Sequence, residues 1–137
     1  MKYRLKKVAV LGSGVMGSGI ACHLANIGME VLMLDIVPPN LEGDQLKDLK
    51  SRNSIVNGAL QNALKSKPAS LYSKSFASRI STGNFDDDFE KIADRDWIIE
   101  VVVERLEIKH QVLQKVDAFR KPKSLVTSNT SSIPIHL

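Results

Sequence analysis

The sequence predicts a doubly wound α/β domain, in which helices cover both faces of a mostly parallel sheet to give three layers. Short apolar runs alternate along the chain with longer segments whose apolar residues recur at helical spacing. The apolar runs are nonpolar at successive positions, as strands buried on both faces require. Strands that alternate with helices in this way pair in parallel through right-handed crossovers.

The first two predicted strands flank a helix. Residues 7–11 form a short apolar run that glycine stops, and residues 30–36 form the second run. Between them, apolar residues from Met16 onward recur at spacings of 4, 4 and 3, which predicts an amphipathic helix that ends at Gly28. This opening therefore predicts a strand, a helix and a second strand in parallel.

A longer helix follows the second strand, after a break at two prolines. Apolar positions from Leu46 to Ala63 recur at alternating gaps of 3 and 4, and we expect one continuous helix that ends before Pro68. Residues 69–79 are ambiguous and partly helical. Residues 80–82 predict a short strand, and the aspartates at 86–88 favour the start of a short helix by capping and by their charge.

The strongest strand signal is "WIIEVVV" at 97–103. A helix follows, whose apolar stripe comprises Ile108, Val112, Val116 and Phe119. Residues 125–127 predict the last strand, which leads into the polar stretch "SNTSS". Ligands of such sheets bind beyond the carboxyl ends of the strands, and the polar residues of this sequence gather at those ends.

Composition limits the class of protein. A length of 137 residues predicts one domain over 1–137, with a helical insertion at about 41–79. The proportions of 43% hydrophobic and 25% charged residues are typical of soluble globular proteins, and no apolar run is long enough for a membrane. The single cysteine excludes an internal disulfide and a cysteine-rich zinc site. We expect no metal, no membrane partner and a cytoplasmic location.

A glycine motif predicts the ligand. Gly12, Gly14 and Gly17 match G-x-G-x-x-G between a strand and a helix, and Asp35 ends the following strand. In a Rossmann-type domain these glycines permit a tight turn, close approach of a diphosphate and close helix packing, while the acid accepts hydrogen bonds from both hydroxyls of the adenosine ribose. The acid favours NAD over NADP, because a 2′-phosphate would meet a like charge. The predicted contacts in the loop are Gly12, Ser13, Gly14, Val15, Met16 and Gly17.

Basic residues concentrate in the middle of the chain. Residues 41–80 carry seven basic and three acidic groups, within a chain of net charge +4. Nucleic acid would suit such a surface, but aromatic interleaving and recognised motifs are missing, so we expect no nucleic-acid partner. A solvated helix face or a small phosphorylated ligand remain as interpretations. A further charge, Glu100, lies inside the strongest strand, where simple burial would be costly, and it must face the crevice or a partner.

Three stretches together resemble one family. "VAVLGSGVMGSGIACHLANIG", "IIEVVVERLEIKHQVL" and "LVTSNTSS" are similar to the amino-terminal domain of L-3-hydroxyacyl-CoA dehydrogenases of fatty-acid β-oxidation. The resemblance implies NAD-dependent oxidation of a 3-hydroxyacyl-CoA to the 3-oxoacyl-CoA. It implies that Val101, Glu104, Lys109 and Asn129 contact the cofactor and that Ser131 bonds the substrate oxygen as a catalytic residue. From the residues alone, Glu104 could instead cap a helix, and Lys109 could be a solvated helix residue.

The resemblance also predicts what lies elsewhere. The catalytic histidine and glutamate of the family lie beyond the S-N-T-S-S segment, so we expect an incomplete domain that binds NAD with little turnover, within a longer protein that forms homo-oligomers. Lys65 and Lys67 are candidate contacts for the phosphates of CoA. Two alternatives stay open: the NAD-binding domain of another β-hydroxyacid dehydrogenase or nucleotide-sugar dehydrogenase, and a noncatalytic NAD-sensing module.

Overall fold

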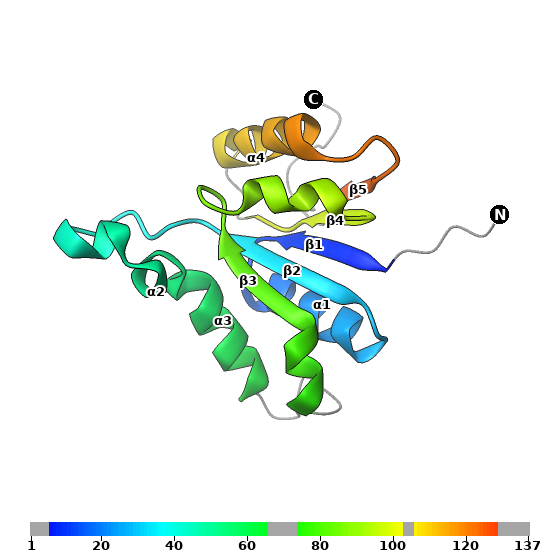
Figure 1. The fold of residues 1–137 in the computed structure, drawn as a ribbon, viewed down its shortest axis with the longest axis horizontal. Coiled ribbons are helices and arrows are strands. Elements are labelled where there is room, and N and C mark those ends of the chain that lie inside the picture. The colour runs from blue at the N-terminus through cyan, green and yellow to red at the C-terminus, as the bar shows by residue number, and fades with distance from the viewer. Residues whose placement is uncertain (1–5, 66–73, 103–105, 129–137) are drawn as a thin grey trace.

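Five parallel strands form one sheet in the order β3-β2-β1-β4-β5, in a computed structural model that describes residues 6–65, 74–102 and 106–128 (Figure 1). The strands are β1 (Lys7–Leu11), β2 (Glu30–Asp35), β3 (Ile80–Asn84), β4 (Trp97–Glu100) and β5 (Leu125–Ser128). The chain starts in the middle of the sheet, proceeds outward to β3 and returns on the other side of β1. Strand order therefore reverses between β1 and β4, as in Rossmann-type sheets, and the predicted fold class is confirmed.

Helices cover both faces of the sheet. Helices α1 (Val15–Asn26) and α3 (Ser54–Leu64) lie on one face, while α4 (Leu106–Phe119) and the 3₁₀ helix η3 (Phe89–Asp94) lie on the other (Figure 1). Alternate residues of β1 divide between the two layers: Val8 and Val10 join one buried cluster, and Ala9 and Leu11 join the other. Both faces of the central strand are thus buried, which explains why its sequence is continuously apolar.

The long helix predicted from Leu46 to Ala63 is wrong as one element. The structure divides it into the 3₁₀ helix η1 (Gly43–Lys47), α2 (Leu49–Arg52) and α3, and η2 (Lys74–Arg79) follows before β3. Asp48 starts α2 by accepting hydrogen bonds from the Ser51 amide at 3.2 Å and hydroxyl at 2.7 Å. Asn53 separates α2 from α3, because its side chain is buried against β3. The buried stripe survives only in α3, at Val56 and Ala63, whereas Leu46 is exposed.

Two further predictions differ from the structure near β3 and β4. The short helix expected after the aspartates at 86–88 is the 3₁₀ helix η3, and none of these side chains caps it. Asp88 instead accepts a hydrogen bond from the Asn84 amide at 2.9 Å. Strand β4 ends at Glu100 rather than Val103, because the Val102 amide turns back to the Glu100 carboxylate at 2.7 Å. Within the described ranges, no helix has the length and apolar character to cross a bilayer.

Asp96 ties three elements together at the amino-terminal edge of the sheet. Its carboxylate accepts hydrogen bonds from the Lys6 and Lys7 amides at 2.9 and 3.0 Å and from the Lys121 ammonium at 2.6 Å. The Lys121 hydrogen bond, followed by that of the Lys7 amide, lowers the pKa of Asp96 to about 2 from 3.8. The carboxylate thus links the start of β1 to the segment between α4 and β5.

We predict that Asp96→Asn lowers the free energy of unfolding by about 1–2 kcal/mol at neutral pH. A folded-state pKa below the unfolded value of 3.8 gives stability that is complete above that value and is lost as the pH falls toward 2. The free energies of unfolding of wild type and Asp96→Asn, measured in urea, should therefore converge as the pH falls from about 4 to about 2. Asp94→Asn is the control: this half-exposed carboxylate pairs with Lys7 and Arg95, and its loss should change the free energy of unfolding by less than about 1 kcal/mol. If the difference in free energy of unfolding between wild type and Asp96→Asn stayed constant with pH, this account would be contradicted.

Candidate dinucleotide site

The turn between β1 and α1 has no room for side chains at two of its glycines. Gly12 has a φ of +115°, and a Cβ there would lie 2.7 Å from the Val101 carbonyl oxygen. A Cβ on Gly17 would lie 2.0 Å from the Gly12 carbonyl oxygen. Since the obstructing atoms are backbone, neither position can accept a larger residue without moving a strand or the helix. Helix α1 therefore starts directly against the ends of β1 and β4.

Gly14, between these two glycines, faces open space. A Cβ added there would meet nothing within 4 Å. Gly14 precedes α1, whose first turn has neither a side-chain cap nor an acidic residue, and Val15 and Met16 are exposed. The amides of this turn and the positive end of the helix dipole thus face a cradle of bare backbone. These residues fit the diphosphate of a dinucleotide, which needs N–H donors and close backbone approach.

Asp35, at the end of β2, is held in place from two sides. The Ser13 amide and hydroxyl donate to its Oδ2 at 2.9 and 2.5 Å, and the Ile36 amide donates to its Oδ1 at 2.7 Å. Ser13 is buried, so its side chain serves Asp35 instead of facing solvent. An ionised carboxylate has about four acceptor positions. Oδ1 is therefore the atom of Asp35 that keeps room for about one further donor, such as a ribose hydroxyl.

A trio of polar side chains, the buried Glu100 and Lys109 and the partly buried Ser128, lies at the ends of β4 and β5. The Lys109 ammonium is 2.9 Å from Glu100 Oε1 and donates to the Ser128 hydroxyl at 2.9 Å. The Ser128 hydroxyl donates to Glu100 Oε1 at 2.6 Å. The side chains of Glu100 and Lys109 are only 0% and 2% exposed. Sequence reasoning required a partner for Glu100 but did not find Lys109, which lies on α4.

The other predicted site residues divide into two groups. Val101 lies beside the glycine turn, and its backbone abuts Gly12. Lys65 is exposed at the end of α3. Because Asn53 and Asn57 bond Asn84 and Thr82 in that order, α3 runs antiparallel to β3, and Lys65 lies toward the edge of the sheet opposite the glycine turn. Four predicted residues lie outside the described residues: Lys67, Glu104, Asn129 and Ser131.

A hollow of about 300 Å³ lies against the segment that directly follows Asp35, and sequence reasoning did not identify it. Its walls come from the segments that directly follow β2 and β3 and from α4. They comprise Ile36, Val37, Phe85, Asp86, Gln111, Val112 and Lys115. The signal available in the sequence was the position of Ile36 and Phe85 immediately after strand ends. The lining combines apolar side chains with Asp86, Gln111 and Lys115, as the mostly apolar pockets that bind small ligands do.

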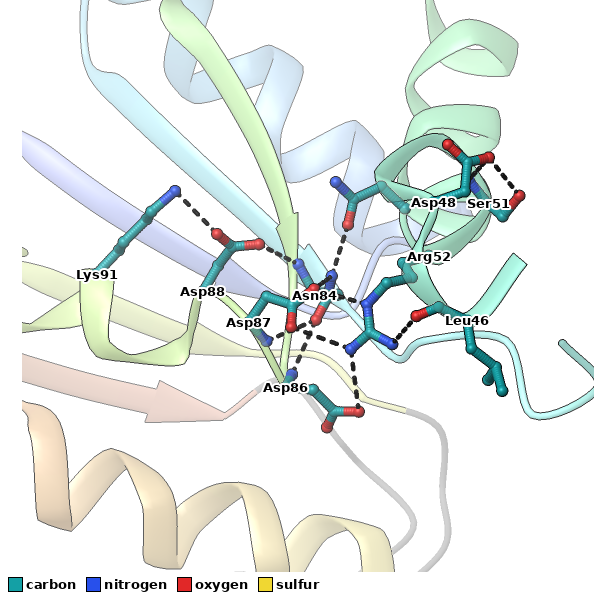
Figure 2. Close-up of polar contacts among 10 residues, drawn as sticks. Leu46, Asp48, Ser51, Arg52, Asn84, Asp86, Asp87, Asp88 and Lys91 are labelled. Atoms are coloured by element: carbon teal, nitrogen blue, oxygen red, sulfur yellow. Dashed lines mark hydrogen bonds and ion pairs between the residues drawn. The ribbon is translucent and has the colours of Figure 1, made fainter. Parts of the chain in front are cut away.

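Asn84, which is paired with Asp35 in the sheet, is the centre of a polar network at the end of β3 (Figure 2). The Asn84 amide group donates to Asn53 Oδ1 at 2.8 Å and to Asp87 Oδ2 at 2.9 Å. Its Oδ1 accepts from the amides of Asp86 and Asp87 at 3.0 and 2.7 Å. Every hydrogen-bonding position of this fully buried side chain is used.

Arg52 extends this network to α2. Its guanidinium binds Asp87 through two hydrogen bonds of 2.8 and 3.0 Å and donates to the Leu46 carbonyl at 2.9 Å (Figure 2). The Arg52 hydrogen bond, with that of Asn84, lowers the pKa of Asp87, and Asp87 raises the pKa of Arg52. The network docks the helical segment before α3 onto the end of β3. Among the described residues, no cluster of three His, Cys, Asp or Glu side chains could hold a metal ion.

A parallel sheet in this order, with a bare glycine turn and an acid after the second strand, defines a dinucleotide-binding domain. Residues 7–137 match the family described as "3-hydroxyacyl-CoA dehydrogenase, NAD binding domain", and the chain belongs to that family. The predicted resemblance and the predicted cofactor, NAD, are thereby confirmed.

Individual relatives agree with the family. The chain is 50% identical over 141 residues to a probable 3-hydroxyacyl-CoA dehydrogenase of Bacillus subtilis. This match covers 98% of this chain and 18% of the relative. It is 41% identical over 134 residues to a probable 3-hydroxyacyl-CoA dehydrogenase of Deinococcus radiodurans, covering 98% and 36%. A solved 3-hydroxybutyryl-CoA dehydrogenase from Escherichia coli matches with a TM-score of 0.65 and 28% identity, over 97% of this chain and 26% of that one. The chain thus spans well under half of the length of each.

We predict different outcomes for alanine at three glycines. Gly17→Ala should lower the free energy of unfolding by about 2–4 kcal/mol, because the new Cβ meets the Gly12 carbonyl. Gly14→Ala should keep the fold but weaken NAD binding by about tenfold or more, because the methyl group fills the diphosphate cradle. Gly19→Ala is the matched control: it is exposed in α1 with open space around it, and should be stabilised by up to about 1 kcal/mol. Urea unfolding and calorimetric NAD titration measure both quantities, and a Gly17→Ala protein as stable as wild type would refute the steric argument.

A second prediction concerns the Asn84 network. Asn84→Asp removes two N–H donors and places a carboxylate against Asp87, so we expect the free energy of unfolding to fall by about 3 kcal/mol. Thr82 lies on the same strand as Asn84 and donates one hydrogen bond to Asn57 of α3, so Thr82→Val should lower the free energy of unfolding by only about 1 kcal/mol. Equal costs in chemical denaturation would show that Asn84 is no more important than a single hydrogen bond.

Proposed function

We propose that the chain is the NAD-binding domain of an NAD-dependent 3-hydroxyacyl-CoA dehydrogenase, one domain over 1–137 with a helical insertion at about 41–79. The observation that carries the proposal is the open backbone cradle at Gly14, in front of α1 and next to the oriented carboxylate of Asp35. The family to which the chain belongs supports the same cofactor.

The residues around the cradle have distinct proposed roles toward NAD. The amides from Gly12 to Gly17 bind the diphosphate, Asp35 Oδ1 accepts a hydroxyl of the adenosine ribose, and the hollow beside Ile36 receives the adenine. Val101, Glu104, Lys109 and Asn129 are proposed to contact the nicotinamide half. NAD, when bound, supplies the hydride acceptor for oxidation of an alcohol. Ser131 is proposed to hydrogen-bond the reacting oxygen of the substrate.

The proposed substrate is a 3-hydroxyacyl-CoA, oxidised to the 3-oxoacyl-CoA. Relatives are named 3-hydroxyacyl-CoA dehydrogenase, 3-hydroxybutyryl-CoA dehydrogenase and fatty acid oxidation complex subunit alpha, which supports an acyl-CoA substrate in fatty-acid oxidation. Lys65 and Lys67 are proposed phosphate contacts, and for the exposed Lys65 this requires a ligand that extends along the outside of α3. We also propose a cytoplasmic, homo-oligomeric protein without nucleic-acid or membrane partners.

We predict that the chain binds NAD at least about tenfold more tightly than NADP. A 2′-phosphate on the ribose would face the Asp35 carboxylate, which lies at the ribose position and has no arginine next to it in the sequence. Asp35→Asn should weaken NAD binding and reduce the preference, because it removes the charge while keeping the shape. Calorimetric titration of both proteins at one ionic strength measures the ratio. Equal affinity of wild type for the two cofactors would refute the role of Asp35, and absence of NAD binding would refute the proposed function.

A further inference from the structure

The carboxylate of Glu100 contacts three separate segments at the end of the sheet that faces the proposed cofactor. Oε1 accepts hydrogen bonds from the Lys109 ammonium of α4 at 2.9 Å and from the Ser128 hydroxyl of β5 at 2.6 Å. Oε2 accepts from the Val102 amide at 2.7 Å, in the loop after β4. One side chain therefore sets the relative positions of α4, β5 and this loop.

These contacts of Glu100 lie next to the glycine turn between β1 and α1. In the sheet, Glu100 is paired with Leu11, which directly precedes Gly12, and with Ser128 on the other side. The Val101 amide donates to the Leu11 carbonyl at 2.8 Å, and the Val101 carbonyl abuts Gly12. Ser128 directly precedes the segment that holds the candidate residues Asn129 and Ser131. The trio thus connects the strand end beside the glycine turn to the end of β5.

Stability alone does not account for a buried ion pair at this place. Two charges that are removed from water lose hydration, and well-packed apolar residues of similar size often give an equally stable protein. A closed triangle of hydrogen bonds does, however, hold an ammonium in one place and one orientation. The lysine in this triangle is one of the proposed contacts of the nicotinamide half.

We propose that Glu100 is a positioning residue of the NAD site, which holds Lys109 and Ser128 where the nicotinamide half of the cofactor needs them. The inference rests on the proposed function and assigns Glu100 no direct contact with the cofactor. Lys109 is the group through which Glu100 acts. Glu100→Gln tests this, because a glutamine of the same shape can still accept from the Val102 amide while it no longer binds the ammonium as a carboxylate does.

The experiment compares NAD with ADP on wild type, Glu100→Gln and Glu30→Gln by calorimetric titration. ADP carries the adenosine and diphosphate that the glycine turn and Asp35 bind, and it lacks the nicotinamide half. We expect Glu100→Gln to bind NAD about tenfold more weakly and ADP within about twofold of wild type. Glu30→Gln removes the same charge at an exposed position at the start of β2 and should change neither affinity. Equal weakening of NAD and ADP, or unchanged NAD binding, would overturn the proposal.

A second variant tests whether Glu100 positions Lys109 for the cofactor or serves only to neutralise the charge of Lys109. Glu100→Gln with Lys109→Met leaves no buried charge in the trio, so its urea midpoint should return toward that of wild type even if Glu100→Gln alone is unstable. We expect its NAD affinity to stay about tenfold weak and its ADP affinity to stay near wild type. Restored NAD affinity would overturn the proposal, because the two charges would then serve only each other. If wild type bound ADP but not NAD, the proposed contacts to the nicotinamide half would be refuted, and the role of Glu100 with them. If wild type bound neither ligand, the proposed function itself would be refuted.

Discussion

The close approach of the β4 exit to the β1 exit is the constraint on which the site depends. The Val101 carbonyl occupies the space that a side chain on Gly12 would need, and the Gly12 carbonyl occupies the space that one on Gly17 would need. Because these are backbone atoms, the two strand ends and the start of α1 form one rigid unit. Its open side is at Gly14, where nothing lies within 4 Å of a Cβ position. The same crowding that excludes side chains inside the turn thus aims the helix amides outward.

The sequence predicted what depends on local pattern. Continuous apolar runs identified β1 and β2 because those strands are buried on both faces. The glycine motif identified the turn because Gly12 and Gly17 have no space for a side chain. Asp35 was identifiable because the residue that ends β2 follows the glycine turn at a spacing fixed by one helix and one strand. Each of these signals lies within residues 7–35, although the Val101 carbonyl that excludes a side chain at Gly12 belongs to a distant segment.

The features that were missed depend on residues far apart in the sequence. The helix predicted from 46 to 63 breaks at Asn53 because its side chain bonds Asn84, 31 positions later. The aspartates at 86–88 were predicted to cap a helix, but the side chains of Asp87 and Asp88 accept hydrogen bonds from Asn84 and Arg52 instead. Glu100 needed a buried partner, but only the folded sheet brings Lys109 and Ser128 to it. The apolar pattern cannot carry such information, because polar side chains that satisfy each other across a fold leave no local period.

The two halves of the candidate site rest on different physics. The adenosine and diphosphate half is formed mainly by backbone, in the glycine turn and the amides of α1, together with one side-chain carboxylate, Asp35, that Ser13 holds in place. The other half is held by side chains, through an ion pair that is buried and closed by a serine hydroxyl. Steric exclusion between backbone atoms does not change with charge state, whereas an ion pair depends on both partners being present and charged. In the first half, the glycines and the Ser13–Asp35 pair are therefore the sensitive positions, whereas the second half depends on the side chains of Glu100, Lys109 and Ser128 throughout.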